Sequence, residues 1–313
     1  MRKIVWTFFV VFVVLVAVLV GASLYMLDYS LAPDPNRLDR DSCYQRLFDN
    51  YPESRDWVDS LLSINALRDT IMTMPSGERH HALYINRGCR RTAVLIHGWR
   101  DCAVKFLWLA RIYERELGYN VLLPELHACG ESDGEAIQMG WLDRLDVLRW
   151  LSEFHADTMV VHGVSMGAAT TMMLSGEADL LQERQQSYGI RDLRFVEDCG
   201  YTSVWDEFAG QMREQFGLPP FPLMYTSSLL CKLLYGWSFG EASAFSQVHR
   251  SRYPMLFIHG AEDAFVPTAM VHPLYEAKPG KKALWIAPEA DHAASYRLHK
   301  DEYIAQLRKF LEL

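Results

Sequence analysis

The fold of this chain is decided by the segment Thr158-Met159-Val160-Val161-His162-Gly163-Val164-Ser165-Met166-Gly167-Ala168-Ala169. It predicts a short buried strand, a sharp turn that carries Ser165, and a helix that begins with small residues. This order is typical of a nucleophile elbow, in which a G-x-S-x-G turn exposes a serine oxygen at the carboxyl edge of a sheet. Gly163 and Gly167 suit such a turn, because the serine backbone is strained and its neighbours are crowded.

The same G-x-S-x-G pattern occurs at two other places, centred on Ser132 and Ser238. The strand nearest to Ser132 spans 120–123 and ends at Pro124, too far before the serine to form an elbow. Ser238 follows a segment that suits a helix as well as a strand, and too little chain follows it for another strand-and-crossover unit before the next candidate acid. Ser165 is therefore the predicted nucleophile, because a strand directly precedes it and a helix directly follows it.

A serine nucleophile needs a base, and the base needs an acid that orients it. Downstream, an apolar strand at 255–258 ends in a glycine turn that presents Asp263, and the loop after the strand at 282–286 presents His292. Ligands of open α/β sheets bind at the carboxyl ends of the strands, where both loops begin. The chain order predicts a triad of Ser165, Asp263 and His292.

Other acidic residues could replace Asp263 in this role. Glu262 and Asp291 are direct neighbours of the two candidates, and Asp198 follows the predicted strand 193–196 at the same edge of the sheet. Asp198 is the strongest of these alternatives, because it too lies just past the end of a strand. Three further histidines precede a glycine at a predicted strand end, and we expect them to be turn residues near the site and not bases: His97, His162 and His259.

Acyl transfer also needs donors that stabilise the developing oxyanion, each contributing roughly 10²–10³ in rate. One expected donor is the backbone N–H of Met166, the residue after the nucleophile. The strand 93–96 is followed by His97-Gly98-Trp99 and by a predicted helix at about 104–117. The N–H of Trp99 is the second expected donor, because it lies in a loop after an earlier strand.

Five motifs in this order resemble the α/β-hydrolase superfamily over about residues 66–313. They are His97-Gly98-Trp99, Pro124-Glu125-Leu126 to Gly130-Glu131-Ser132-Asp133-Gly134, Gly163-Val164-Ser165-Met166-Gly167, His259-Gly260-Ala261-Glu262-Asp263 to Val266-Pro267, and Asp291-His292. The chain is most similar to bacterial serine-aminopeptidase-like hydrolases with one N-terminal membrane segment. The resemblance implies an α/β-hydrolase fold: a mostly parallel sheet of about eight strands with helices on both faces and a helical lid.

One loop departs from the pattern of that family. The loop after the fourth strand usually carries an arginine and a second histidine, and Leu126-His127-Ala128-Cys129 stands there instead. The departure leaves the predicted triad untouched. It concerns only the substrate contacts beside this loop.

An uncharged run of 24 residues, Ile4 to Leu27, lies near the N-terminus. At about 1.5 Å per residue it measures about 36 Å, enough to span a hydrocarbon core of roughly 30 Å. Arg2 and Lys3 precede it, which predicts a cytoplasmic N-terminus and an extracytoplasmic remainder at the periplasm or cell surface. The alternative is a signal peptide cut near Ala22, which would give a secreted protein. We favour a retained anchor, because signal-peptide apolar regions run to only about 7–15 residues.

The rest of the chain is acidic. Arg2 and Lys3 account for two of the 31 basic residues, which leaves 29 against 39 acidic ones and a net charge of −10. This charge argues against a nucleic-acid partner, since phosphates need a basic surface. The chain has no paired C-x-x-C and no H-E-x-x-H, so we expect no metal and no cofactor. Six cysteines in an exported domain could form disulfides, and we predict a Cys102–Cys129 bridge between loops after adjacent strands.

The predicted domain organisation has three parts. Residues 1–27 form the anchor, 28–65 a linker and a helical lead-in, and 66–313 the hydrolase domain. Residues 68–85 indicate two strands around a Pro75-Ser76-Gly77 turn. Between about 200 and 250 the strand–helix rhythm breaks, and this insertion is a candidate lid. Its aromatic side chains either line an apolar pocket or pack the lid onto the body: Phe208, Phe216, Phe221, Tyr225, Tyr235, Trp237 and Phe239.

The sequence therefore predicts a membrane-anchored serine hydrolase that cleaves a carboxylic ester or related acyl bond through an acyl-enzyme. The expected partners are a small acyl or peptide substrate and, through residues 4–27, the membrane. One alternative is an exported peptidase, which needs a carboxylate such as Glu125 or Glu207 to hold a free amino terminus. The other is a non-catalytic, hydrolase-like binding protein.

Overall fold

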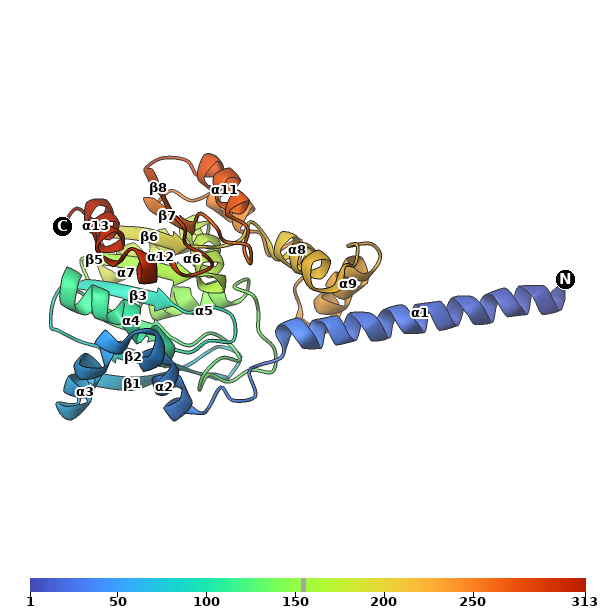
Figure 1. Ribbon diagram of the computed structural model, residues 1–313, viewed down its shortest axis with the longest axis horizontal. Helices are drawn as coiled ribbons and strands as arrows, with labels where there is room; N and C mark the ends of the chain where they lie inside the picture. The colour runs from blue at the N-terminus through green and yellow to red at the C-terminus, as the bar shows by residue number, and fades with distance from the viewer. Residues whose placement is uncertain (153–155) are drawn as a thin grey trace.

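The computed structural model describes residues 1–152 and 156–313, and in that part of the chain eight strands form one sheet (Figure 1). The strand order is β1-β2-β4-β3-β5-β6-β7-β8. β2 is antiparallel to both of its neighbours, and the other pairs are parallel. The strands are β1 (Leu67–Thr73), β2 (Arg79–Ile85), β3 (Arg91–Ile96), β4 (Asn120–Pro124), β5 (Thr158–Val164), β6 (Asp192–Asp198), β7 (Met255–Gly260) and β8 (Lys282–Ala287).

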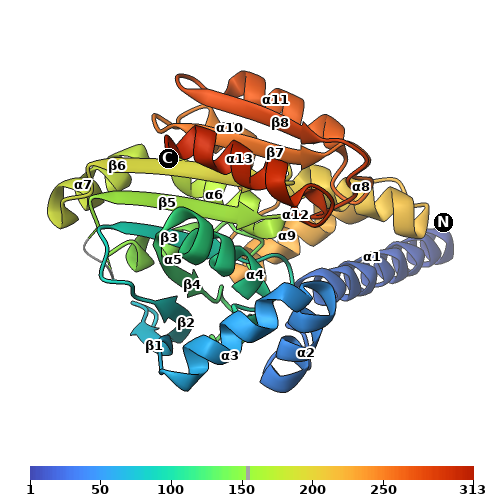
Figure 2. The same cartoon turned by 60° about the vertical axis from the view of Figure 1, so that its left-hand side comes forward.

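Helices cover both faces of the sheet (Figures 1 and 2). The two cores follow from the alternation of side chains along each strand: Val94 and Ile96 face one core, and Ala93 and Leu95 face the other. The first core is covered by α5 (Asp143–Trp150), α6 (Met166–Ser175), α7 (Ala178–Tyr188), α10 (Ala244–Val248) and α11 (Val271–Ala277). The second is covered by α2 (Arg40–Asn50), α3 (Arg55–Ser63), α4 (Leu107–Arg111), α12 (Ser295–Leu298) and α13 (Lys300–Leu311). The predicted mostly parallel sheet with helices on both faces is confirmed.

Four short helical turns complete the body: η1 (Pro52–Ser54), η2 (Val104–Phe106), η3 (Ile112–Leu117) and η4 (Thr268–Met270). The single helix expected at about 104–117 is therefore divided into η2, α4 and the π-helical η3. The wider π turn buries three consecutive residues, Ile112, Tyr113 and Glu114. The preceding helix α4 is also buried at consecutive residues, Leu107 to Ala110, so this segment packs into the core on more than one face.

The predicted Cys102–Cys129 disulfide is wrong. All six cysteines lie in the described part of the chain and are free thiols. Cys102 belongs to the core on the α2 side of the sheet, where its thiol contacts that of Cys43, whereas Cys129 belongs to the core on the opposite side. Both loops follow adjacent strands, but the two thiols face different cores and therefore do not meet.

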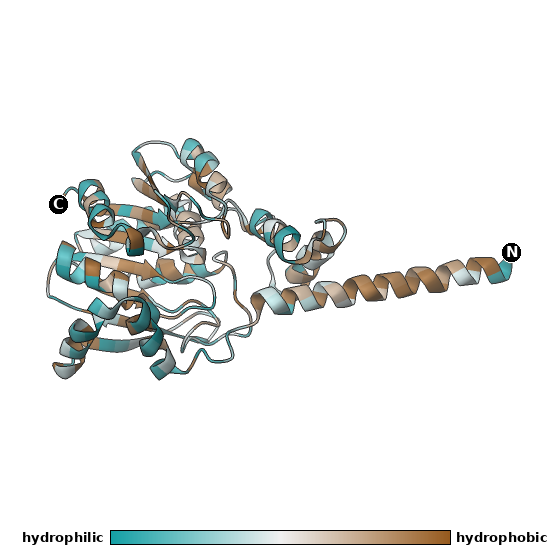
Figure 3. Cartoon of the chain, in the orientation of Figure 1, coloured by the Kyte–Doolittle hydropathy of each residue, from teal (hydrophilic) through white to brown (hydrophobic). Residues whose placement is uncertain are grey.

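The apolar helix α1 (Arg2–Leu31) projects from the body (Figure 1), and its hydrophobic colouring runs along most of its length (Figure 3). Among the described residues it is the one helix long and apolar enough to cross a membrane. The helix continues through residues 28–31, which we expected to be linker. One face of its last turns is buried or half-buried, at a helical spacing of three and four: Leu19, Ala22, Ser23, Met26, Leu27, Ser30 and Leu31.

The segment between β6 and β7 contains α8 (Val204–Phe216) and α9 (Leu223–Tyr235), which we call the lid helices, followed by α10. Ser203 caps α8 by accepting a hydrogen bond from the N–H of Asp206, and Gly217 ends it in a left-handed conformation. α9 packs against α1, where the Ser23 hydroxyl donates to Thr226 Oγ1 at 2.7 Å. The lid helices therefore lie beside the carboxyl-terminal end of α1 (Figure 1).

Candidate active site

Ser165 lies in the turn between β5 and α6, with φ 59° and ψ −121°. A Cβ on Gly163 would lie 2.0 Å from the carbonyl oxygen of Gly167, and one on Gly167 would lie 2.2 Å from the carbonyl oxygen of Ile96. Both positions therefore exclude any side chain. The N–H of Ser165 donates to the carbonyl of Asp198 at 2.8 Å, which ties the turn to β6. The predicted strand–turn–helix around Ser165 is confirmed.

Three of the predicted site residues form one hydrogen-bonded chain. His292 Nε2 lies 2.8 Å from Ser165 Oγ, and His292 Nδ1 lies 2.8 Å from Asp263 Oδ2. Asp263 comes from the loop after β7 and His292 from the loop after β8. This is the geometry that a serine, its base and the orienting acid require.

Asp263 is held as a buried anion. Burial alone would raise its pKa, but hydrogen bonds with His259 and His292 bring the pKa to about 2. Its Oδ1 also accepts the backbone N–H groups of Phe265 and Val266, at 3.0 and 2.9 Å. The carboxylate is thus ionised at neutral pH, where it fixes the His292 ring with Nδ1–H directed towards it.

His259 contributes to this environment, a role that the sequence did not reveal. Its Nε2 lies 3.3 Å from Asp263 Oδ2 and 2.9 Å from the carbonyl oxygen of Val266. We expected only a turn residue at this strand end. The i, i+4 spacing of His259 and Asp263 across the Gly260 turn is the signal that could have indicated the contact.

The side chains of the alternative residues do not join this hydrogen-bonded chain. Asp198 accepts a hydrogen bond from the Tyr303 hydroxyl at 2.9 Å, and burial raises its pKa to about 6. The Ser132 hydroxyl donates to the Glu125 carbonyl at 2.7 Å, and Ser238 contacts Glu241. The remaining candidates also have other partners: His97 Nε2 accepts the N–H of Leu126, His162 contacts Tyr113 and Tyr303, and Asp291 accepts the N–H of His292.

The loop that carries the expected oxyanion donor Trp99 closes over the elbow. A Cβ on Gly98 would lie 3.6 Å from the Cβ of Ser165. The side chains of this loop bind the end of α1: Trp99 Nε1 donates to the carbonyl of Ser30 at 2.9 Å, and Arg100 donates to the carbonyls of Tyr29 and Ala32 at 3.1 and 2.9 Å. They satisfy carbonyls that the end of a helix leaves without partners. An oxyanion role for the N–H groups of Trp99 and Met166 stays a prediction.

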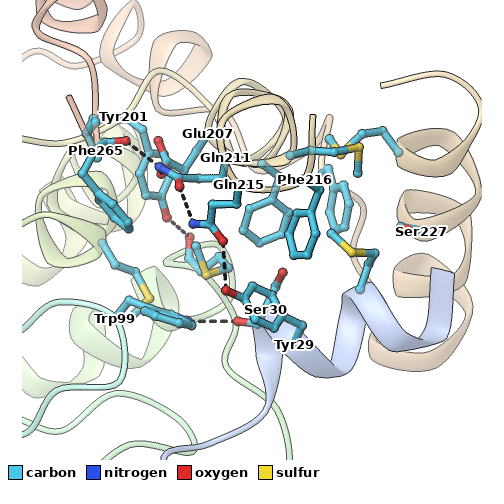
Figure 4. A pocket seen from close by; sticks show the side chains of 18 of the residues that line it. Tyr29, Ser30, Trp99, Tyr201, Glu207, Gln211, Gln215, Phe216, Ser227 and Phe265 are labelled. Carbon is cyan, nitrogen blue, oxygen red and sulfur yellow. Dashed lines mark hydrogen bonds between the residues drawn. The ribbon is translucent and has the colours of Figure 1, made fainter. Parts of the chain in front are cut away.

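An apolar pocket lies beside Ser165, between the body, the lid helices and α1 (Figure 4). Its apolar lining is Met26, Trp99, Met139, Met166, Tyr201, Phe208, Met212, Phe216, Met224, Phe239, Phe265 and Val266. The aromatic side chains of the lid divide between the two predicted roles. Phe208, Phe216 and Phe239 line the pocket, Trp237 is buried outside its lining, and a third group is exposed: Phe221, Tyr225 and Tyr235.

A second cleft meets the first pocket at Ser165. It is more polar, and its lining includes Arg46, Arg297 and the ion pair of Lys105 with Asp101, as well as His292. The nucleophile candidate therefore stands between an apolar pocket and a polar, partly basic cleft. This arrangement suits a substrate with one apolar and one polar end.

Glu207 is a buried acid inside the apolar pocket. Its side chain is 5% exposed, and burial raises its pKa to about 8, so the carboxyl is neutral at pH 7. Gln211 Nε2 donates to Glu207 Oε1 at 3.1 Å, Gln215 Nε2 donates to Gln211 Oε1 at 2.7 Å, and the Tyr29 hydroxyl donates to Gln215 Oε1 at 2.9 Å (Figure 4). Among the described residues, Glu207 Oε2 has no hydrogen-bond partner. Glu207 therefore offers one free polar atom to a pocket ligand.

Glu125 does not line this pocket. Its carboxylate contacts His81 Nδ1 at 2.9 Å and accepts the N–H groups of Ala103 and Glu131 at 3.0 and 2.6 Å. The Glu125 carboxylate therefore connects two loops of the body. Of the two carboxylates proposed from the sequence for an amino terminus, only Glu207 is placed to meet a ligand.

One group of possible metal ligands overlaps the site. The ligand atoms of Cys199, Asp263 and His292 lie within 4.8 Å of one another. Burial raises the pKa of the Cys199 thiol well above its usual range. The other two side chains already bind each other. The closeness of Asp263 and His292 is therefore accounted for by their hydrogen bond.

The sheet order, the antiparallel second strand, the helices on both faces and the elbow after β5 together define an α/β-hydrolase fold. Solved structures share it at low sequence identity. The Pyrococcus furiosus esterase Pf2001 has a TM-score of 0.60 and 21% identity, over 79% of this chain and 92% of that one. The Pyrococcus horikoshii acylaminoacyl peptidase has a TM-score of 0.54 and 16% identity, over 79% of this chain and 40% of that one.

Two bacterial proteins are similar in sequence. The uncharacterized protein YqkD of Bacillus subtilis (strain 168) is 27% identical over 231 residues, which is 71% of each chain. The uncharacterized protein YfhR of Escherichia coli O157:H7 is 25% identical over 201 residues, 63% of this chain and 61% of that protein. No protein-family model matches the chain. The likeness to solved structures establishes the fold and leaves the activity to be argued from the site.

The substitution Gly163→Ala tests the crowding at the elbow. We expect it to destabilise the protein by about 1–3 kcal/mol or more, because the new methyl group overlaps the Gly167 carbonyl. Gly210→Ala in α8 is the matched control, since no atom lies within 4 Å of its added Cβ. Thermal unfolding of both variants measures the difference. Equal melting temperatures for the two variants would contradict the proposed crowding.

The substitution Glu207→Gln tests the buried acid. The pKa of Glu207 is about 8 in the folded protein, against an ordinary value of 4.5 in the unfolded chain. The stability that this difference contributes is fully present below about pH 4.5 and is lost as the pH rises through about 8. We therefore expect the melting temperature of wild type to fall relative to that of Glu207→Gln between pH 5 and pH 8.5. Parallel melting curves over this range would show that Glu207 titrates normally.

Proposed function

We propose that this protein is a serine hydrolase that cleaves a carboxylic ester or a related acyl bond through an acyl-enzyme. The observation that carries the proposal is the continuous hydrogen-bonded chain from Ser165 through His292 to Asp263, at 2.8 Å for each step. It stands at a strained elbow beside an apolar pocket. The names of an esterase and a peptidase among the solved structures of this fold support the hydrolase class.

In the proposed mechanism Ser165 Oγ attacks the carbonyl carbon while His292 Nε2 takes the hydroxyl proton. The N–H groups of Trp99 and Met166 stabilise the oxyanion. Collapse of the tetrahedral intermediate breaks the bond to the leaving group, which receives the proton from His292. Water then repeats the sequence on the acyl-enzyme. Asp263 stays ionised throughout and stabilises the imidazolium, consistent with its pKa of about 2.

We also propose that α1 is a retained membrane anchor, with the N-terminus in the cytoplasm and the catalytic domain outside it, in the periplasm or at the cell surface. Arg2 and Lys3 support this orientation. Retention is supported by the end of α1, where Ala22 and Ser23 are helical and pack against the lid. A signal peptidase would need this segment unwound and accessible.

An exported peptidase is the second candidate, and Glu207 favours it. A buried carboxyl with a free oxygen in the pocket could ionise on binding the ammonium group of a peptide amino terminus. The ester hydrolase remains the first proposal, because the lining around Glu207 is mostly apolar and keeps the acid neutral. The non-catalytic alternative requires an inert Ser165.

Fluorophosphonate labelling of the full-length protein tests the nucleophile. We expect a label on Ser165 that is lost in Ser165→Ala and in His292→Ala, with ester turnover reduced at least about 10³-fold. Ser132→Ala and Ser238→Ala are the matched controls, and both should keep the label. Folded wild-type protein without any label would favour the non-catalytic alternative.

A panel of acyl esters and aminoacyl amides separates the two enzyme candidates. We expect esters to be preferred and Glu207→Gln to change their kcat/KM at pH 7 by less than about threefold, because a neutral amide replaces a neutral acid of the same shape. A preference for aminoacyl amides, with a kcat/KM for these amides that falls at least tenfold in Glu207→Gln, would instead assign the peptidase function.

A further inference from the structure

We propose that the substrate is an acyl lipid of the bilayer, which enters from the outer leaflet where α1 meets the lid, and that the exposed face of α9 lies in that leaflet. The inference rests on the proposed hydrolase function and on the proposed anchor. It adds the substrate class and the route by which the substrate reaches Ser165.

The position of α9 along α1 sets its depth in the membrane. A hydrocarbon core of about 30 Å takes about 20 helical residues. Counted from Ile4, the first residue after the terminal charges, that length ends at Ser23. Because the Ser23 hydroxyl donates to Thr226 Oγ1 at 2.7 Å, the first half of α9 lies at the outer boundary of the hydrocarbon.

The outward face of α9 is apolar. Tyr225, Leu229 and Leu233 recur at every fourth residue of α9, with exposed fractions of 58, 59 and 71%. Phe221, just before the helix and 73% exposed, lies four residues ahead of Tyr225. Each large apolar side chain left in water forgoes the favourable free energy that its burial would give. We assign the bilayer as the partner of this face because it continues the apolar surface of α1 at the depth just derived. Aromatic side chains such as those of Phe221 and Tyr225 also suit the membrane interface, Tyr above all.

The pocket connects this surface with the nucleophile. Met26 and Tyr29 of α1 form part of its lining together with Phe216 of α8 and Met224 of α9, and Ser165 lies in the same lining. Met26 is three residues beyond Ser23, about 4.5 Å further along the helix, which is within the headgroup layer. Tyr29 and Phe216 meet where α1 contacts the lid (Figure 4), with their rings edge to face and the centroids 5.6 Å apart.

A lipid suits both sides of the site. Its acyl chain would occupy the apolar pocket, its carbonyl would reach Ser165, and its polar end would lie in the second cleft with Arg46 and Arg297. Ser165 Oγ would bond to the acyl carbonyl carbon, and the ester C–O bond would break. The lipid alcohol would leave with the proton of His292, and water would release the fatty acid and restore Ser165.

Two measurements on the full-length protein in phosphatidylcholine vesicles test the inference. The variant Leu229→Glu/Leu233→Glu charges the outward face of α9 without changing the pocket lining. The matched control, Leu180→Glu/Leu298→Glu, charges two leucines that are 40 and 52% exposed on α7 and α12. The substrates are soluble 4-nitrophenyl butyrate and a vesicle phosphatidylcholine with a fluorogenic acyl chain.

We expect the α9 variant to keep kcat/KM for the soluble ester within about twofold and to lose at least tenfold in hydrolysis of the vesicle lipid, while the control keeps both. Equal lipid hydrolysis by the variant and its control would overturn the inference. So would a wild type that hydrolyses the soluble ester and leaves the vesicle lipid intact. Wild-type protein without activity on either substrate and without a label on Ser165 would instead overturn the proposed function.

An NBD fluorophore on Leu233→Cys reports the depth of this face directly, and Leu298→Cys carries the control probe. Both are compared with the parent protein after the same labelling reaction. We expect nitroxide lipids to quench the probe at position 233 and to leave that at 298 unchanged. An unquenched probe at position 233 would overturn the inference, and this result can be read even if the glutamate variant fails to fold. A probe at 233 that is buried against a second copy of the chain would overturn it as well.

Discussion

The structure depends on the close approach of three backbone segments at the elbow. The end of β5, the start of α6 and the end of β3 meet at Gly163 and Gly167, where any side chain would overlap a carbonyl group. This contact holds Ser165 at a positive φ, and its N–H is bound to β6. A strained residue persists only when its surroundings determine it so fully. The position of the hydroxyl relative to His292 follows from this packing.

The end of α1 is part of the site as well as a candidate anchor. Its last carbonyls are bound by Trp99 and Arg100, which belong to the loop that closes over Ser165. Two of its side chains, Met26 and Tyr29, line the pocket. The apolar helix, the candidate oxyanion loop and the lid therefore form one packed unit, so a fragment that begins after this helix would lack a wall of the pocket.

Burial has opposite effects on the acids near Ser165, according to their partners. Asp263 has two histidines and two backbone N–H groups, and its pKa falls to about 2 in spite of burial. Glu207 has one amide partner in an apolar pocket, and its pKa rises to about 8. Asp198 is intermediate, with the Tyr303 hydroxyl as its partner and a pKa of about 6. Hydrogen bonds to the charged form and nearby histidines lower the pKa against burial, and Asp263 has the most of both, whereas Glu207 has one amide partner and no histidine.

The sequence by itself determined the strands, the elbow and the order of the candidate triad, because apolar periodicity and the steric demand for glycine act between near neighbours in the chain. It could not place the end of α1, where Asp28 and Ser30 interrupt the apolar run and suggest a linker. Only the tertiary structure decided that these residues stay helical, that Glu207 and not Glu125 meets the pocket, and that Cys102 contacts Cys43. Each outcome depends on partners far away in the chain, such as Trp99 for Ser30, and on which face of the sheet a side chain occupies.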